Sequence, residues 1–189
     1  VWKTSFLLAM YLEEHLKMPK SGCLRVLEVG SGCGLLGLSL AHRGCDVVLS
    51  EQPQALPNLT RNVKANSKGL DPAPTVKQLR WDSEEDRIAL SSEPFDLIVG
   101  TDVVFAERLV EPLLATMHQL ASSETTVWLC LQQRDADAHR ELMATVPLYF
   151  QVEDLSTSLR DVRGCDFADE LECILLKLSA KVDRSGSKK

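Results

Sequence analysis

A glycine-rich turn between an apolar β-type run and a helical pattern constrains this chain more than any other feature. The run covers residues 24–29, the turn reads Glu28-Val-Gly-Ser-Gly-Cys-Gly34, and the helical pattern covers residues 35–43. A Cβ atom would obstruct so tight a turn and the approach of a ligand to its backbone. The helix start behind the turn offers free N–H groups to it. The segment therefore predicts a strand–turn–helix unit that holds a ligand.

The rest of the chain alternates between strand and helix patterns, which predicts a parallel sheet covered on both faces. We expect strands at 24–29, 46–50, 75–81, 95–101 and 125–131, and helices at 4–16, 35–43, 58–68, 107–120 and 136–145. Strands at 148–154 and 171–178 have no helix between them, so they predict an antiparallel pair joined by a loop at 155–170. The expected fold class is α/β, a Rossmann-like, doubly wound, mostly parallel seven-strand sheet.

The length and the net charge of the chain limit the number of domains and the kinds of partner that it can bind. We expect a single domain over residues 1–180 and a disordered polar tail over 181–189. The net charge of -6 disfavours a large nucleic-acid footprint, which needs clustered Lys and Arg. The sequence contains no run of 18 apolar residues, so it predicts no membrane span. The acidic stretch 83–86 is interpreted as a solvated loop.

The six cysteines form no C-x-x-C pair, so we expect reduced thiols and no metal site. We expect a monomer in the cytoplasm, with the nucleus as a further compartment.

Two acidic residues limit the choice of ligand for the glycine turn. Glu51 ends the second strand, 21 residues after Gly30, where a carboxylate can accept hydrogen bonds from both hydroxyls of a ribose. Gly32-Cys-Gly34-Leu-Leu-Gly37 formally matches the dinucleotide motif G-x-G-x-x-G, so an NAD-type ligand stays open. However, Glu28 would repel a diphosphate and suits the ammonium group of a methionine moiety. We therefore favour S-adenosylmethionine, with a purely structural turn as the third alternative.

Four segments resemble a known family. These are Val1-Trp2 at the start of a helix, Glu28-Val-Gly-Ser-Gly-Cys-Gly34, Leu79-Arg-Trp81-Asp82 and Thr101-Asp102-Val-Val-Phe105. The glycine turn and the final antiparallel pair are similar to class I S-adenosylmethionine-dependent methyltransferases. The four segments together resemble the methyltransferase-like protein-lysine methyltransferases that act on chaperones, the valosin-containing ATPase and elongation factors. The resemblance implies a methyltransferase that uses S-adenosyl-L-methionine and modifies a lysine-bearing protein.

The resemblance also implies a cofactor site, residue by residue. The methionine end of the cofactor would be lined by Glu28, Gly30, Gly32 and Gly34, and Glu51 would hold the ribose.

The adenine end would lie against Trp81, through its ring, and Asp82, through the exocyclic amine. Trp2 would close over the cofactor, and Thr101 would lie beside its methionyl group through the backbone.

Two residues are the catalytic candidates that the resemblance implies. Asp102 would face the methyl group and the incoming lysine, and it follows a buried strand at the end where open α/β sheets bind ligands. Phe105 stands where the family's D-x-x-Y motif has tyrosine, so the hydroxyl is lost while the ring face is kept. A ring can still hold an ammonium by cation–π attraction. This departure leaves two alternatives open: a non-catalytic cofactor-binding interaction protein and a small-molecule methyltransferase.

Overall fold

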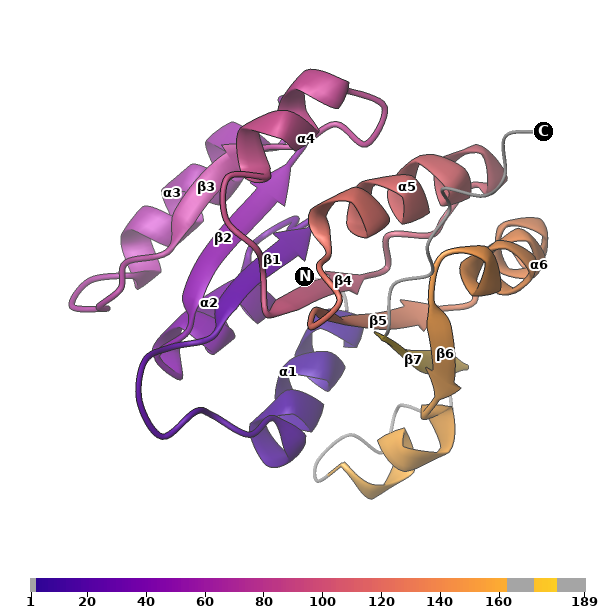
Figure 1. Ribbon diagram of the computed structural model, residues 1–189. Coiled ribbons are helices and arrows are strands. Elements are labelled where there is room, and N and C mark those ends of the chain that lie inside the picture. Colours follow the sequence, from indigo (N-terminus) through magenta and orange to yellow (C-terminus); the bar gives the residue numbers. More distant parts are fainter. Residues whose placement is uncertain (1–2, 163–171, 180–189) are drawn as a thin grey trace.

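A seven-strand sheet forms the centre of the molecule in the computed structural model, which describes residues 3–162 and 172–179 (Figure 1). The strands are β1 (Arg25–Val29), β2 (Asp46–Glu51), β3 (Thr75–Gln78), β4 (Leu97–Thr101), β5 (Thr126–Gln132), β6 (Gln151–Asp154) and β7 (Cys173–Ser179). Their order across the sheet is β3-β2-β1-β4-β5-β7-β6. Strands β1 to β5 run parallel, and β7 lies antiparallel to both β5 and β6. The predicted fold class is confirmed.

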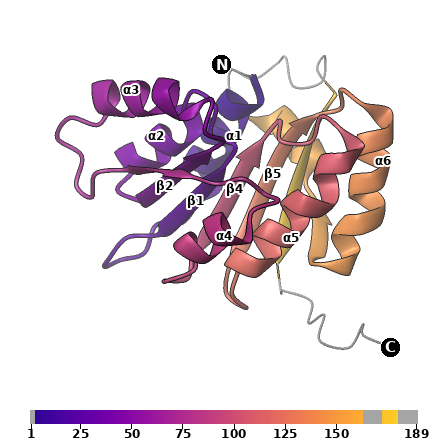
Figure 2. The ribbon, with the colours of Figure 1, turned by 90° about the horizontal axis from the view of Figure 1, so that it is seen from above.

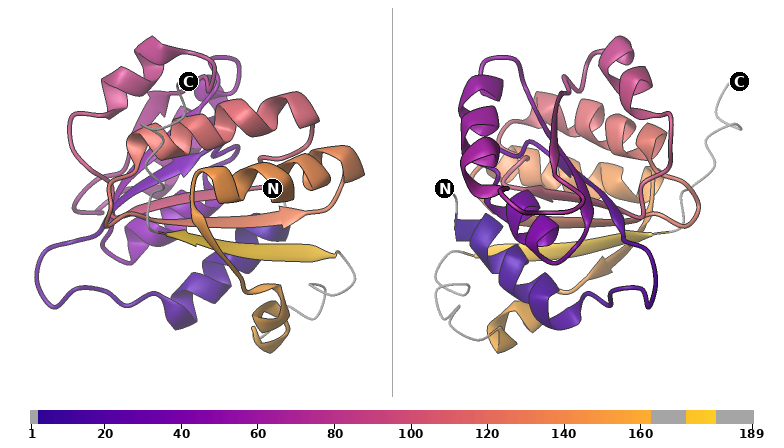
Figure 3. Two further views of the ribbon diagram at one scale, coloured as in Figure 1. Left: turned by 45° about the vertical axis from the view of Figure 1, so that its right-hand side comes forward. Right: turned by 90° about the vertical axis from the view of Figure 1, so that its left-hand side faces the viewer.

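Helices cover both faces of the sheet (Figures 2 and 3). One face carries α1 (Lys3–His15), α2 (Leu35–His42) and α3 (Leu56–Asn66), and the other carries α4 (Glu84–Leu90), α5 (Val110–Leu120) and α6 (Ala136–Thr145). Side chains alternate across a strand, so each strand supplies both layers. In β1, Val26 packs into the core under α1 and α2, while Leu27 packs into the core under α5. This explains why the central strands are almost wholly apolar.

The order of the strands reverses between β1 and β4. After β1 the chain adds β2 and then β3 on one side, and after β3 it crosses to add β4 on the other side of β1. The connections after β1 and β4 therefore leave toward opposite faces, which opens a crevice at the carboxyl ends of these two strands. The glycine turn follows β1 and Asp102 follows β4, so this crevice brings the two segments together.

Several predicted boundaries differ from the structure. The third strand ends at Gln78 instead of residue 81, and the third helix spans Leu56–Asn66, because Pro57 fits its first turn. Residues 155–170 were expected to be a loop, but a 3₁₀ helix covers Ser156–Asp161. The sixth strand begins only at Gln151, after a 3₁₀ turn at Val146–Leu148. Residues 163–170 and the expected tail at 181–189 lie outside the described residues.

The interpretation of residues 83–86 as a solvated loop is wrong. Ser83 is the N-cap of α4 and its hydroxyl accepts from the Asp86 N–H at 3.2 Å. The Asp86 carboxylate is 7% exposed and accepts from the Arg80 Nε at 2.8 Å and the Arg80 backbone N–H at 2.9 Å. These donors, together with Gln78, hold the pKa of Asp86 below its usual range. The acid is thus an anchor that ties α4 to the end of β3.

Replacing the buried carboxylate at position 86 should destabilise the fold. Asp86→Asn should lower the free energy of unfolding by about 1–3 kcal/mol at pH 7, because the Arg80 donors lose their ionic acceptor. The loss is kept small because water screens the charge of the half-exposed Arg80. Because the pKa of Asp86 is lowered by folding, this stabilisation is present above the ordinary carboxyl pKa and is lost as the pH falls below it. Urea unfolding followed by circular dichroism at several pH values measures the difference.

The matched control is Asp137→Asn. Asp137 pairs with Arg140 on α6, and both side chains are exposed. An exposed pair of this kind contributes little. Equal losses from the two substitutions would show that Asp86 is not a structural anchor.

Candidate active site

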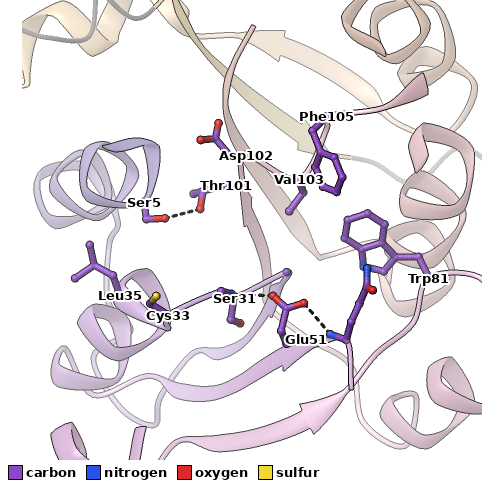
Figure 4. A pocket seen from close by; sticks show the side chains of 13 residues that line it. Ser5, Ser31, Cys33, Leu35, Glu51, Trp81, Thr101, Asp102, Val103 and Phe105 are labelled. Atoms are coloured by element: carbon purple, nitrogen blue, oxygen red, sulfur yellow. Dashed lines mark hydrogen bonds between the residues drawn. The ribbon is translucent and has the colours of Figure 1, made fainter. Parts of the chain in front are cut away.

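A cleft lies at the carboxyl ends of β1, β2 and β4 and contains about 760 Å³ of empty space, including the part that opens to solvent. The walls come from α1, from the glycine turn, from the ends of β2 and β4, and from the turns after β3 and β4 (Figure 4). The lining residues are Ser5, Gly30, Ser31, Gly32, Cys33, Leu35, Glu51, Gln52, Trp81, Thr101, Asp102, Val103 and Phe105.

The glycine turn forms the floor of this cleft. Gly30 has a φ of 63°, and a Cβ there would lie 2.8 Å from Val103 Cγ1, so both the backbone conformation and the neighbouring side chain require glycine. Gly32 also lines the cleft, whereas Gly34 is buried at the start of α2 and does not. The predicted turn is therefore present, with Gly30 and Gly32 on the cleft surface and Gly34 behind it.

Glu51 lies at the end of β2 with its carboxylate in the cleft. Its Oε2 accepts from the Gly32 N–H at 2.9 Å, and its Oε1 accepts from the Gln52 N–H at 2.7 Å. Each oxygen of an ionised carboxylate has a second lone-pair direction available. The backbone bonds therefore orient the carboxylate and leave it able to accept from a pair of ligand hydroxyls.

Glu28 does not line the cleft, contrary to the position that the resemblance implies. Its side chain is 2% exposed and its Oε2 accepts from the Gly37 N–H of α2 at 3.1 Å. Burial raises the pKa of Glu28 to about 8, against 4.5 for an ordinary glutamate. The carboxyl group therefore lies between β1 and α2, and at neutral pH it is mainly protonated in this state of the protein.

Gly37 is a residue whose role the sequence did not reveal. A Cβ at this position would lie 2.6 Å from Glu28 Oε2 and 2.7 Å from Leu49 Cδ2. Glycine therefore allows α2 to lie close against β1 and β2. The signal was present in the sequence as the third glycine of the formal dinucleotide motif, but it serves helix–strand packing.

The turn after β3 brings Trp81 to the cleft and leaves Asp82 beside it. Trp81 lines the cleft, where its indole lies near Gly30 and Val103 (Figure 4). Asp82 is exposed and lines an adjoining hollow that shares Gln52 and Trp81 with the cleft. Gln52 and Trp81 therefore lie where the two spaces adjoin.

Thr101 ends β4 and its side chain contacts α1. Its Oγ1 and the Ser5 hydroxyl are 2.7 Å apart, and both residues line the cleft. Ser5 was not predicted as a site residue, because a serine in an amphipathic helix carries no distinctive signal. Trp2, expected to close over the cofactor, lies outside the described residues.

Asp102 follows β4 in a backbone conformation that side chains rarely adopt, with a φ of 51°. Its Oδ1 accepts from the Gln132 N–H at 2.8 Å, and its Oδ2 accepts from Arg134 Nη2 at 3.3 Å. The carboxylate is 4% exposed, while the Phe105 residue is 52% exposed at the cleft wall. A strained residue held by its surroundings at the end of a central strand is typical of a functional position. Arg134 was missed because its pairing with Asp102 spans 32 residues.

The chemistry of this cleft fits S-adenosylmethionine. The glycine turn is followed by a carboxylate oriented for hydroxyl groups and then by an indole beside a second acid, which corresponds to the order of the methionyl, ribose and adenine groups in the cofactor. Within residues 3–162 and 172–179, the structure has no group of three or more His, Cys, Asp or Glu side chains able to hold a metal ion. In the same part of the chain, no helix is long and apolar enough to cross a bilayer.

The raised pKa of Glu28 predicts a pH-dependent stability. Between pH 4.5 and about pH 8, Glu28 keeps its proton in the folded protein and loses it in the unfolded chain. The contribution of Glu28 to wild-type stability therefore falls as the pH rises through this range. Glu28→Gln keeps an acceptor for the Gly37 N–H and removes the ionisation. It should therefore gain about 1 kcal/mol or more over wild type between pH 5 and pH 8.5 in urea unfolding. A difference between Glu28→Gln and wild type that does not change with pH would contradict this.

Comparison with known proteins supports this interpretation of the cleft. A family profile described as lysine methyltransferase matches residues 1–146. Protein-lysine methyltransferase METTL21E of Mus musculus is 31% identical over 159 residues, which cover 83% of this chain and 65% of the relative. Protein N-lysine methyltransferase METTL21A of Danio rerio is 36% identical over 135 residues, covering 71% of this chain and 60% of the relative. The chain thus spans less than two thirds of the length of these relatives.

Solved structures agree with the fold. The glycopeptide N-methyltransferase MtfA, complexed with S-adenosyl-L-methionine, has a TM-score of 0.65 at 14% identity, covering 93% of each chain. A TehB-like S-adenosylmethionine-dependent methyltransferase of Corynebacterium glutamicum has a TM-score of 0.60 at 17% identity, covering 96% of this chain and 89% of that one. The structural likeness supports the fold, and the family match supports S-adenosylmethionine as the cofactor. The chain belongs to the lysine methyltransferase family, as its motifs predicted.

Proposed function

We propose that this chain transfers a methyl group from S-adenosylmethionine to a lysine side chain of a protein substrate. The observation that carries the proposal is the position of Asp102, which is held at the carboxyl end of β4 and lines the same cleft as the glycine turn. The family membership and the relatives named as protein-lysine methyltransferases support a lysine as the acceptor.

The acceptor amine has to be neutral and aligned when it reacts. The cofactor, when bound, supplies a methyl group already activated by a sulfonium, so the protein mainly positions the nucleophile. The lysine amine has a pKa of about 10.4 in water, and both burial and a nearby positive charge favour its neutral form. Arg134 is paired with Asp102, so the carboxylate offsets its charge, and desolvation of the amine is what favours the neutral form in this proposal.

The Asp102 carboxylate accepts one shorter and one longer hydrogen bond. Gln132 N–H holds Oδ1 at 2.8 Å, whereas Arg134 lies at 3.3 Å from Oδ2 and has a side chain that is 38% exposed. An incoming ammonium offers the same charge and donor type as Arg134. In this proposal the lysine shares Oδ2 with Arg134, and Asp102 orients it toward the cofactor.

Phe105 would provide an apolar wall for the lysine chain at the mouth of the cleft. Its half-exposed ring can cover the aliphatic part of a lysine and attract its ammonium, an interaction of about 0.5–2 kcal/mol. The absence of a hydroxyl also favours the second candidate, a non-catalytic protein that binds the cofactor and a partner. A small-molecule methyltransferase is the third candidate, and the acceptor assays below separate them.

Elongation factor 1A is the first acceptor to test, because one relative, from Xenopus tropicalis, is named EEF1A lysine methyltransferase 3; it is 28% identical over 81% of this chain. A monomeric state, the absence of nucleic-acid and membrane partners, and a cytoplasmic and nuclear location remain predictions from the sequence.

Cofactor binding can be measured before any acceptor is known. S-adenosylhomocysteine at about 100 times its Kd should raise Tm by roughly 5–10 °C, whereas NAD should leave it unchanged. Glu51→Gln should weaken binding of S-adenosylhomocysteine by roughly tenfold, because an amide cannot accept from both hydroxyls while it holds the two backbone N–H groups. Calorimetric titration provides the affinities. A shift with NAD alone would overturn the assignment of the cleft.

Transfer to protein should depend on Asp102. Asp102→Asn should reduce incorporation of radiolabelled methyl into recombinant elongation factor 1A, and into other recombinant candidate proteins, by on the order of 100-fold. Its affinity for S-adenosylhomocysteine should change little. Full transfer by Asp102→Asn would contradict its role. Phe105→Tyr is the companion variant, and activity that appears only in Phe105→Tyr would favour the non-catalytic alternative for the natural chain.

A further inference from the structure

The peptide bond between Trp81 and Asp82 is held by two helices that lie outside the cleft. The carbonyl oxygen of Trp81 accepts from Arg87 Nη1 at 2.6 Å and from Thr116 Oγ1 at 3.0 Å. Arg87 belongs to α4 and Thr116 to α5, and neither lines the cleft or the adjoining hollow. The oxygen thus has a donor from each helix for its two lone pairs.

Both donors are themselves fixed. Thr116 is fully buried in α5, so its hydroxyl has little freedom to find another acceptor. The Nε of Arg87 donates to Gln119 Oε1 on α5 at 2.7 Å, which directs the rest of the guanidinium toward Trp81. The chain segment from 80 to 83 is tied at its start as well, because Asp86 binds the backbone and the side chain of Arg80.

Fixing this carbonyl fixes the residues on both sides of it. A peptide unit is planar, so the orientation of the Trp81 C=O also sets that of the Asp82 N–H and the positions of the Trp81 and Asp82 Cα atoms. Trp81 presents its indole to the cleft, and Asp82 lines the hollow next to it. The contacts from α4 and α5 therefore hold the backbone from which the aromatic ring and the acid extend.

We propose that Thr116 and Arg87 are positioning residues for cofactor recognition, which set Trp81 and Asp82 at the adenine. This inference rests on the proposed adenine role of these two residues. It implies that the preference for adenine over a base without the exocyclic amine is controlled from the interface of α4 and α5, although no atom of Thr116 reaches the cofactor cleft. Thr116 is the residue best suited to a test, because a methyl group can replace its hydroxyl with little change of shape.

The experiment compares two ligands by calorimetric titration of the whole chain. S-adenosylhomocysteine carries the exocyclic amine, and its deaminated analogue S-inosylhomocysteine carries a carbonyl oxygen instead. Thr116→Val should weaken binding of S-adenosylhomocysteine by roughly 3–10-fold and reduce the preference for it over the analogue, because the Trp81 carbonyl loses one of its two donors. Thr116→Ser, which keeps the hydroxyl, should restore most of the affinity and the preference.

A matched control exists at the other end of the sheet. Thr125 is also buried, and its Oγ1 donates to the carbonyl of Phe95 at 2.6 Å, near the amino ends of β4 and β5. Thr125→Val therefore removes the same kind of hydrogen bond far from the cleft, together with the contacts of Thr125 Oγ1 to the N–H and the hydroxyl of Ser122 at 2.8 and 3.0 Å. Its affinity for S-adenosylhomocysteine should stay within about twofold of wild type at a temperature where unfolding curves show every variant to be folded.

The outcomes separate this inference from the assignment of the cleft. Asp82→Ala should reduce the preference for S-adenosylhomocysteine over its analogue, and an unchanged preference would overturn both the adenine role and the inference. If Asp82→Ala lowers the preference but Thr116→Val does not, the adenine role stands and the inference is overturned. Equal losses of affinity in Thr116→Val and Thr125→Val would also overturn it, because the effect would then be one of general stability.

Discussion

The close contact between α2 and the sheet is the constraint on which the cleft depends. Glu28 in β1 and Gly37 in α2 meet at 3.1 Å through a hydrogen bond, and no side chain larger than glycine fits at position 37. This contact fixes where α2 begins and therefore how sharply the chain has to turn between β1 and α2. The turn passes through positive φ at Gly30, Gly32 and Gly34, which leaves its backbone uncovered at the cleft floor. An acid that seemed to belong to the ligand site is thus part of the packing that creates the site.

The reversal of strand order explains why distant segments share one cleft. The glycine turn follows β1 and Asp102 follows β4, and these strands are neighbours whose connections leave toward opposite faces. Glu51 joins them from the end of β2, where its carboxylate binds the Gly32 N–H. Each residue comes from a different part of the chain, but all lie at the carboxyl edge of one sheet. The proposed chemistry uses this arrangement, with cofactor groups on the β1 and β2 side and the acceptor on the β4 side.

Side chains from α4, from α5 and from the turn before α6 add polar anchors that do not themselves line the cleft. Asp86 binds Arg80, Arg87 and Thr116 bind the Trp81 carbonyl, and Arg134 binds Asp102. These pairs join residues from separate elements, so they hold side chains of the cleft wall in one arrangement. In the proposed function, cofactor and acceptor recognition therefore depend on residues beyond those that line the cleft.

The sequence by itself determined the fold class and the family, because these depend on local patterns. Alternation of strands and helices indicates a parallel sheet, and the spacing of Gly30, Gly32 and Glu51 predicts a nucleoside site at its edge. Only the tertiary structure decided the environment of each acid. Glu28 is buried against α2, Asp86 is paired inside a helix that was interpreted as a loop, and Asp102 is held by Arg134. Burial and pairing depend on residues brought together by folding from elsewhere in the chain, and no local pattern records them.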